Sequence, residues 1–154
     1  MSDKINQPDN MEFGGCLKIE WNPSFGAQTQ EKMHRVQCAI DSAALKYMYP
    51  YMPFRSGALI KLTETATVAG SGQIVCPGPY AHYLYMGEIY GPNIPIREDG
   101  QIVGFFSPPS KQKTGRPLTY DTTKNPLAGA HWFERMKADH KDDILKVAQH
   151  EANR

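Results

Sequence analysis

The sequence of 154 residues predicts a single α+β domain with a helix toward each end and short strands between them. Two observations carry this prediction. None of the 12 prolines lies between Ser24 and Tyr49 or after Pro126, and a proline inside a helix costs about 3 kcal/mol. Between these two windows the chain is divided by Gly and Pro into short apolar and Thr-rich segments, which is typical of strands and turns.

The first predicted elements are a strand and a long helix. Apolar and charged residues alternate over Leu17–Trp21, as in a half-buried strand. We expect Asn22 to cap the helix that follows, with Pro23 at its first position, and Pro50 to end it. One face of that helix is apolar because residues at steps of three or four share it: Met33, Val36, Ile40, Ala43 and Tyr47.

The middle of the chain predicts two hairpins. The Thr-rich segment Ala58–Val68 is predicted as a strand that turns at Gly70–Gly72 and returns over Gln73–Cys76. A second hairpin is predicted from Ile94–Ile96 and Ile102–Phe106 around a turn at Asp99 and Gly100.

Two further segments complete this reading. Tyr80–Glu88 is either a short helix or an extended aromatic segment. After Ser107 about 20 residues show no periodicity, so we expect a long loop there. The last helix is predicted from about Ala130 to Gln149 and is expected to fray after Val147.

These elements predict a flexible arm at residues 1–16, one α+β domain at residues 17–149 with a loop region at 90–128, and a frayed tail at 150–154. The polar start lacks the apolar segment of a signal peptide, and no apolar run approaches the roughly 18 residues of a membrane span. The net charge of +1 gives no bulk attraction to nucleic acid or an anionic membrane.

The candidate chemical groups are few. Cys16, Cys38 and Cys76 are widely spaced and odd in number, which favours reduced thiols. His131 and His140 are expected on opposite sides of the last helix, so they cannot share a metal from it.

Cys76 precedes His82 by six positions, which leaves a small thiol enzyme as an alternative, although a free cysteine more often packs as a small apolar residue.

Two loops invite a nucleic-acid or phosphate interpretation. Ala69–Gly72 is glycine-rich but lacks a following helix and a Walker-type lysine, so it is predicted to be a turn. Lys111–Arg116 is a short basic run, typical of a solvated loop, and leaves a nucleic-acid-binding module as a second alternative.

The aromatic residues indicate a protein interface. The chain contains 8 tyrosines, more than a small α+β core comfortably hides, and tyrosine is enriched where proteins meet. The candidate contact residues are those near the aromatic clusters and the long loop: Tyr80, Tyr83, Tyr85, Arg116, Tyr120 and Trp132.

Three segments together resemble the minor capsid and tail-completion (head–tail joining, neck) proteins of long-tailed phages. They are Pro53–Leu59 (PFRSGAL), Pro79–Gly87 (PYAHYLYMG) and Gly115–Arg135, which contains GRPLTY and NPLAGAHWFER. Members of that family show a P-x-x-[ST]-G-x-L turn, a YA-x-Y-x-x-x-G element and a C-terminal helix. The resemblance covers about Leu17–Val147, but Gly91–Ser110 has no counterpart in the wider family.

The resemblance implies a long helix packed on a small antiparallel sheet, and a structural virion protein at the head–tail junction. It implies a homo-oligomeric ring with six- or twelve-fold symmetry that contacts neck, portal or tail proteins and passively contacts DNA in the channel. Such proteins assemble in the bacterial cytoplasm without catalysis, cofactor, metal or membrane, and the family has no catalytic residues to transfer. An adaptor, stopper or minor capsid component is the structural alternative.

Overall fold

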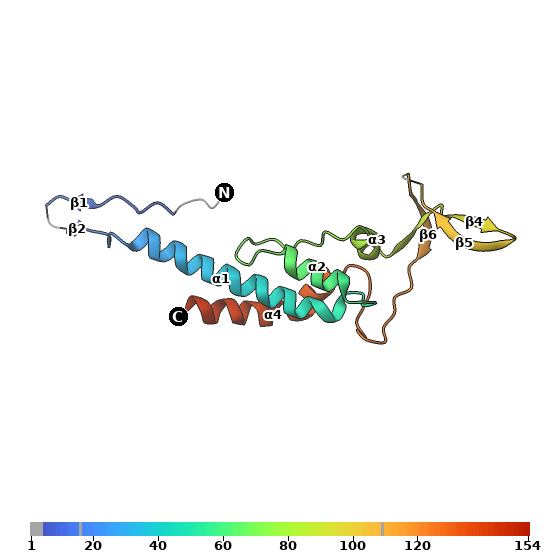
Figure 1. The fold of residues 1–154 in the computed structure, drawn as a ribbon. Helices are drawn as coiled ribbons and strands as arrows, with labels where there is room; N and C mark the ends of the chain where they lie inside the picture. Colours follow the sequence, from blue (N-terminus) through green and yellow to red (C-terminus); the bar gives the residue numbers. More distant parts are fainter. Residues whose placement is uncertain (1–4, 16, 109) are drawn as a thin grey trace.

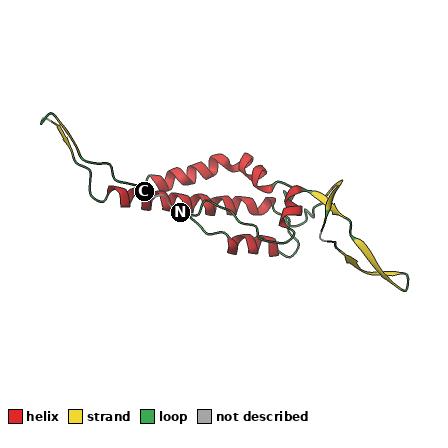
Figure 2. Ribbon diagram, turned by 90° about the horizontal axis from the view of Figure 1, so that it is seen from above, coloured by secondary structure: helices red, strands yellow, loops and turns green. Residues whose placement is uncertain are grey.

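The computed structural model describes residues 5–15, 17–108 and 110–154. Its central body is helical, and a two-stranded hairpin projects from each end, so the molecule is elongated (Figure 1). Seen from above, the helices gather in the middle and the strands lie at the two extremities (Figure 2). The predicted α+β class is therefore confirmed, with the strands at the ends of a helical body.

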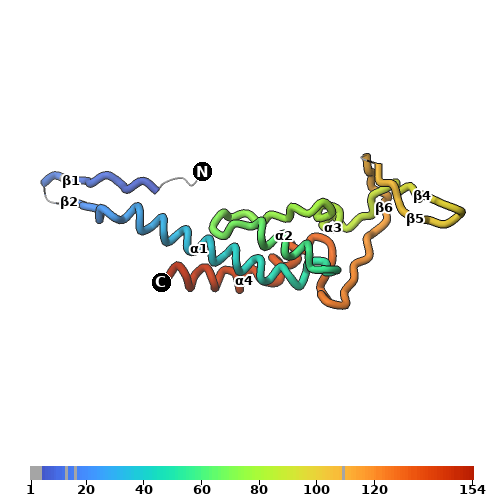
Figure 3. Tube along the Cα trace, viewed as in Figure 1, coloured from blue at the N-terminus to red at the C-terminus, as the bar shows by residue number. Residues whose placement is uncertain are grey.

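Two long helices form the body. Helix α1 spans Phe25–Met48 and continues into a 3-10 turn, η1, at Tyr49–Tyr51, where Pro50 ends the α-helical pattern as the sequence predicts. Helix α4 spans Trp132–Ala152, beginning later and ending later than predicted. The two run in opposite directions side by side and share the most extensive contact in the described chain (Figure 3).

The core lies where α1, η1 and the start of α4 converge. Its fully buried members are large and apolar, with Met48, Met52, Trp132 and Met136 each at most 2% exposed. Partly buried side chains from the other elements close around them: Leu59, Ile60, Ile74, Leu84, Tyr85 and Phe133. The core is small and occupies only one region of the elongated molecule.

The start of α1 differs from the prediction. Its N-cap is Ser24 rather than Asn22, and Asn22 instead forms a turn before the helix, accepting hydrogen bonds from the Ser24 amide (3.0 Å) and hydroxyl (2.8 Å). Gly26 is buried under the segment that precedes it, since a Cβ there would lie 3.0 Å from the Ile5 carbonyl oxygen. A close backbone approach thus explains a glycine in the first turn.

The predicted hairpin at residues 58–76 is wrong. Ala58–Ala66 forms helix α2 and residues 73–76 are extended without a strand partner, although the turn at Gly70–Gly72 is present. The Thr residues, on which the predicted strand rested, fit into α2 because their hydroxyls donate hydrogen bonds to carbonyl groups in the preceding turn of that helix. Thr63 Oγ1 donates to the Leu59 carbonyl at 2.8 Å, and Thr65 Oγ1 donates to the Lys61 carbonyl at 3.0 Å.

The aromatic segment after Pro79 resolves as helix α3, Ala81–Met86, which ends at Gly87 in the left-handed conformation that glycine accommodates (φ 72°). Leu84, on α3, packs against the core, so this short helix belongs to the body.

The described strands form three separate two-stranded antiparallel sheets. β1 (Met11–Phe13) lies in the segment predicted as a flexible arm, of which residues 1–4 and Cys16 lie outside the described residues. It pairs with β2 (Leu17–Ile19), which confirms part of the strand predicted at Leu17–Trp21. β3 (Glu88–Gly91) pairs with β6 (Gln112–Pro117), and β4 (Ile94–Glu98) pairs with β5 (Gln101–Phe106). The predicted second hairpin is thus confirmed, whereas β6 was predicted as loop.

Candidate protein interface

Tyr80 and Tyr83, the first two predicted contact residues, lie at the start of α3. Tyr80 is 71% exposed, so it is available to a partner. Tyr83 is half-buried, and its ring meets that of Tyr90 edge-to-face, with 4.7 Å between the ring centroids. His82 packs against both rings, at 5.6 Å from Tyr83 and 6.3 Å from Tyr90. This cluster fixes α3 on β3 and leaves Tyr80 protruding beside it.

Tyr85 and Trp132 form an internal contact rather than an external one. Their rings pack edge-to-face with centroids 4.7 Å apart, and Trp132 is only 2% exposed. The Tyr85 hydroxyl donates a hydrogen bond to the Glu134 carboxylate, and burial together with this bond raises the pKa of Tyr85. Trp132 is therefore a core residue of the protomer, which corrects its prediction as a surface contact.

Tyr120 holds the long connection between β6 and α4 against the body. Its hydroxyl donates to the Leu84 carbonyl at 2.5 Å, and burial raises its pKa. Gly87 is required beside it, because a Cβ there would lie 2.6 Å from the Ala130 Cβ and 3.2 Å from the Tyr120 hydroxyl. Arg116, four residues before Tyr120, is exposed on β6.

The three segments that carry the family resemblance meet at one core. Leu59 comes from the first, Tyr85 from the second and Trp132 from the third, and all three pack in the same hydrophobic cluster. These motifs therefore specify how α2, α3 and α4 join.

Cys76 and His82 both line a cavity of about 520 Å³ between α1, α3 and the start of α4. The Cys76 sulfur lies 3.2 Å from Thr63 Oγ1, and this polar contact ties the extended segment 73–76 to α2. His82 is engaged with the tyrosine rings described above. The observed partners of both residues are thus structural ones.

Asp41 explains the glycine-rich turn and was missed in the sequence. It is 4% exposed, and its carboxylate accepts hydrogen bonds from the amides of Gly70 (2.8 Å) and Gly72 (3.1 Å) and from the Gln37 side chain (2.7 Å). Two backbone amides aimed at one buried carboxylate hold the turn on α1. The amides of Gly70 and Gly72, which a phosphate-binding loop would direct at its ligand, are thus bonded within the protein.

The basic run is partly engaged within the protein. The Lys111 amine donates to the Asn93 side chain at 2.9 Å, and Lys113 forms an ion pair of 3.3 Å with Glu88. Arg116 stays exposed. Over the described residues, no group of three His, Cys, Asp or Glu side chains is placed to hold a metal ion.

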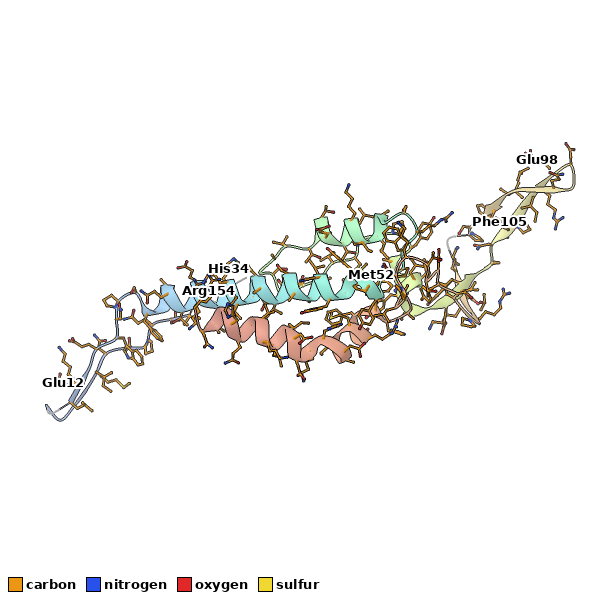
Figure 4. The ribbon with its side chains drawn as sticks, turned by 90° about the horizontal axis from the view of Figure 1, so that it is seen from below. Glu12, His34, Met52, Glu98, Phe105 and Arg154 are labelled. Carbon is orange, nitrogen blue, oxygen red and sulfur yellow. The ribbon has the colours of Figure 1, made fainter. Side chains whose placement is uncertain are left out.

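The hairpin β4–β5 gathers six exposed large apolar side chains in one short segment. Its apolar side chains are 47–64% exposed: Ile94, Ile96, Ile102, Val103, Phe105 and Phe106. Figure 4 shows Phe105 and Glu98 at the extremity opposite Glu12, well away from Met52 in the body. The apolar runs IPI and IVGFF were a signal in the sequence, but they were interpreted there only as strands.

A large groove lies at the base of this hairpin. It measures about 1090 Å³ and is bounded by the η1–α2 connection, α2, α3, β3 and the chain after β6. Its walls are largely aromatic and aliphatic, including Phe54, Leu62, Tyr80, Tyr83, Ile89 and Leu118. Predicted contact residues Tyr80, Tyr83 and Tyr120 all line it. The groove and the hairpin together form the candidate interface.

Across the part of the chain that the structure describes, no helix is long and apolar enough to cross a membrane. Comparison with known proteins finds no match among family models, curated proteins or solved structures.

Proposed function

We propose that this chain is a structural subunit of the phage head–tail connector, a tail-completion ring protein that joins the portal or connector to the tail. It acts by assembly rather than catalysis and uses no cofactor. The resemblance of three segments to minor capsid and neck proteins supports the choice of this assembly.

The observation that carries the proposal is the amount of exposed surface. The chain has an accessible surface of 11366 Å², whereas a compact monomer of its mass, 17.3 kDa, exposes about 7,800 Å². The difference of about 3,500 Å² falls within the range that obligate interfaces bury. A chain with this shape is suited to be completed by neighbours.

The physical mechanism is the closure of a ring by repeated contacts. Each protomer supplies a rigid helical body, anchored by the core around Met52 and Trp132. Its hairpins project from that body and order against neighbouring subunits, so that folding of the extremities is coupled to assembly. Contacts between different surfaces of identical subunits form closed rings when the rotation between them closes.

Cryo-electron microscopy of purified virions tests the proposal. A ring of density at the head–tail junction that fits the α1–α4 body supports it. Density of this chain on the shell instead makes it a minor capsid component, and density in an adaptor or stopper layer moves it to a neighbouring ring of the neck. Absence of the chain from the particle overturns the structural function altogether.

A further inference from the structure

We propose that the β4–β5 hairpin of one subunit inserts into the groove beside Tyr80 of a second copy of this chain. The inference deepens the proposed function, since it names the contact by which a ring would close. It combines an apolar hairpin that projects from its own body with an apolar groove, both in the same chain.

The hairpin is apolar on both faces. In its register Ile94 lies opposite Phe106, and Pro95 lies opposite Phe105. Successive residues of a strand face opposite sides of the sheet, so these two apolar pairs lie on opposite faces of the hairpin. An antiparallel hairpin that faces water on one side alternates apolar and polar residues. This pattern indicates a hairpin that is covered on both faces when it is in place.

The hairpin does not obtain this cover from its own body. Within the described residues, the only extensive contact of β4 and β5 with another element is the one they make with each other. Phe105 is 64% exposed and Val103 is 58% exposed. An isolated two-stranded hairpin is at best marginally stable in water. The cover is therefore expected from another molecule.

The groove has the size and chemistry to provide it. At about 1090 Å³ it exceeds the roughly 300–1,000 Å³ of sites for small molecules, and the lining from Phe54, Leu62, Tyr80 and Leu118 is apolar. Asn93 and Ser107, at the root of the chain's own hairpin, form one rim. The hairpin projects away from the helical body (Figures 1 and 4), and none of the described residues of β4 or β5 lines the groove at its own base.

A second copy is the occupant that the molecule itself supplies. Every subunit carries one hairpin and one groove, so each makes two such contacts, once as donor and once as acceptor. A standard interface buries about 800 Å² of each partner, so two of them bury about 1,600 Å² of each subunit. This is less than the excess surface of about 3,500 Å² that each subunit exposes. Since the two surfaces differ, the contact is heterologous, the kind that generates rings.

Photo-crosslinking of the full-length chain tests the contact. Benzoylphenylalanine replaces Phe105, and a mixture of isotope-labelled and unlabelled copies separates links between subunits from links within one. We expect links between subunits to peptides at 54–62 or 79–84. The matched control places the same probe at Phe25, 37% exposed at the start of α1, and should give no link to those peptides.

Substitution provides an independent measurement. Phe105→Glu should weaken self-association in sedimentation experiments at least about tenfold, because it removes an apolar anchor. The melting temperature of the monomer, measured at concentrations too low for association, should stay unchanged. Val68→Glu, at a residue 69% exposed outside the hairpin and the groove, should leave association unchanged.

The outcomes separate this inference from the proposed function. A ring whose Phe105 probe links to the groove supports both. A reciprocal dimer or an open filament with that same link supports the hairpin contact and contradicts the ring. A ring whose probe links elsewhere overturns the hairpin contact and leaves the connector proposal standing. A chain that stays monomeric with no link between subunits also overturns it.

Discussion

The Tyr51 hydroxyl donates a hydrogen bond of 2.6 Å to the Asp139 carboxylate and so joins the 3-10 turn after α1 to the first half of α4. The ring of Tyr51 is 3% exposed and belongs to the core, while its hydroxyl reaches the edge of α4. The Tyr51 side chain thus fills part of the core with its ring and, through its hydroxyl, fixes the position of α4 along the end of α1.

Tyr51→Phe should lower the free energy of unfolding by about 1 kcal/mol, the net value of one hydrogen bond, because the ring stays in place. Chemical denaturation with a linear extrapolation measures the change. Tyr80→Phe is the control, since that side chain is 71% exposed and should change stability by less than about 0.5 kcal/mol. Equal effects of the two substitutions would show that the bond to Asp139 contributes nothing.

Stability should fall at alkaline pH, and Tyr85 should contribute to the fall. The folded protein raises the pKa of Tyr85 above the ordinary tyrosine value of 10.0, chiefly by burial and then by the hydrogen bond to Glu134. The stabilisation is fully present below pH 10, where unfolded tyrosine is still protonated, and is lost as the pH rises through the raised pKa. Thermal melts of Tyr85→Phe should therefore lose less stability above pH 10 than those of the parent chain. An identical pH dependence of both proteins would refute this.

Gly70→Ala should destabilise the protein more than Gly100→Ala. Both glycines have a positive φ, +89° and +81°, so an alanine is strained by about 1 kcal/mol at either position. Only at Gly70 would the new Cβ also collide, at 2.8 Å from the Cys38 sulfur and 2.5 Å from the His34 ring. We expect an additional loss of about 1–3 kcal/mol there, measured by denaturant unfolding. Equal losses would mean that the turn moves freely away from α1.

Met136→Ala should cost about 2–5 kcal/mol, because Met136 is fully buried between α1 and α4 and the surrounding core refills such a space only in part. Met33→Ala, on the same pair of helices but 61% exposed, should change stability by less than about 0.5 kcal/mol. Urea denaturation compares the two variants. A similar small effect for both would place the core elsewhere.

The long helices were predictable because their signals are local. The two proline-free windows predict both long helices, and the apolar spacing adds support for α1. Pro50 predicts where α1 ends. Helix α2 was missed because Thr residues favour strands on average, whereas Thr63 satisfies its hydroxyl within the helix. Strand β6 was missed because its pairing with β3 is non-local, and its bond from Thr114 to the Ile89 carbonyl (2.6 Å) has no signal in the sequence.

The candidate interface was predictable in part. The clustering of aromatic residues predicted contacts near Tyr80, and the Tyr80 side chain is exposed. It also selected Trp132, because composition does not distinguish an aromatic side chain in the core from one on the surface. The groove joins residues from Pro53 to Asp121 and exists only once the chain is folded, so no local pattern reveals it.

The ladder of β3 and β6 also has a consequence for how this chain can vary. Gly91 pairs with Gln112 at the end of that ladder, so the backbone leaves and re-enters the body at neighbouring points, about 5 Å apart. Residues 92–111 therefore form an excursion between the paired ends of β3 and β6, and a two-residue turn of the Asn-Gly type can replace it. The body and the projecting element are separable modules, so the excursion can be lengthened, shortened or exchanged without redesigning the helices that carry it.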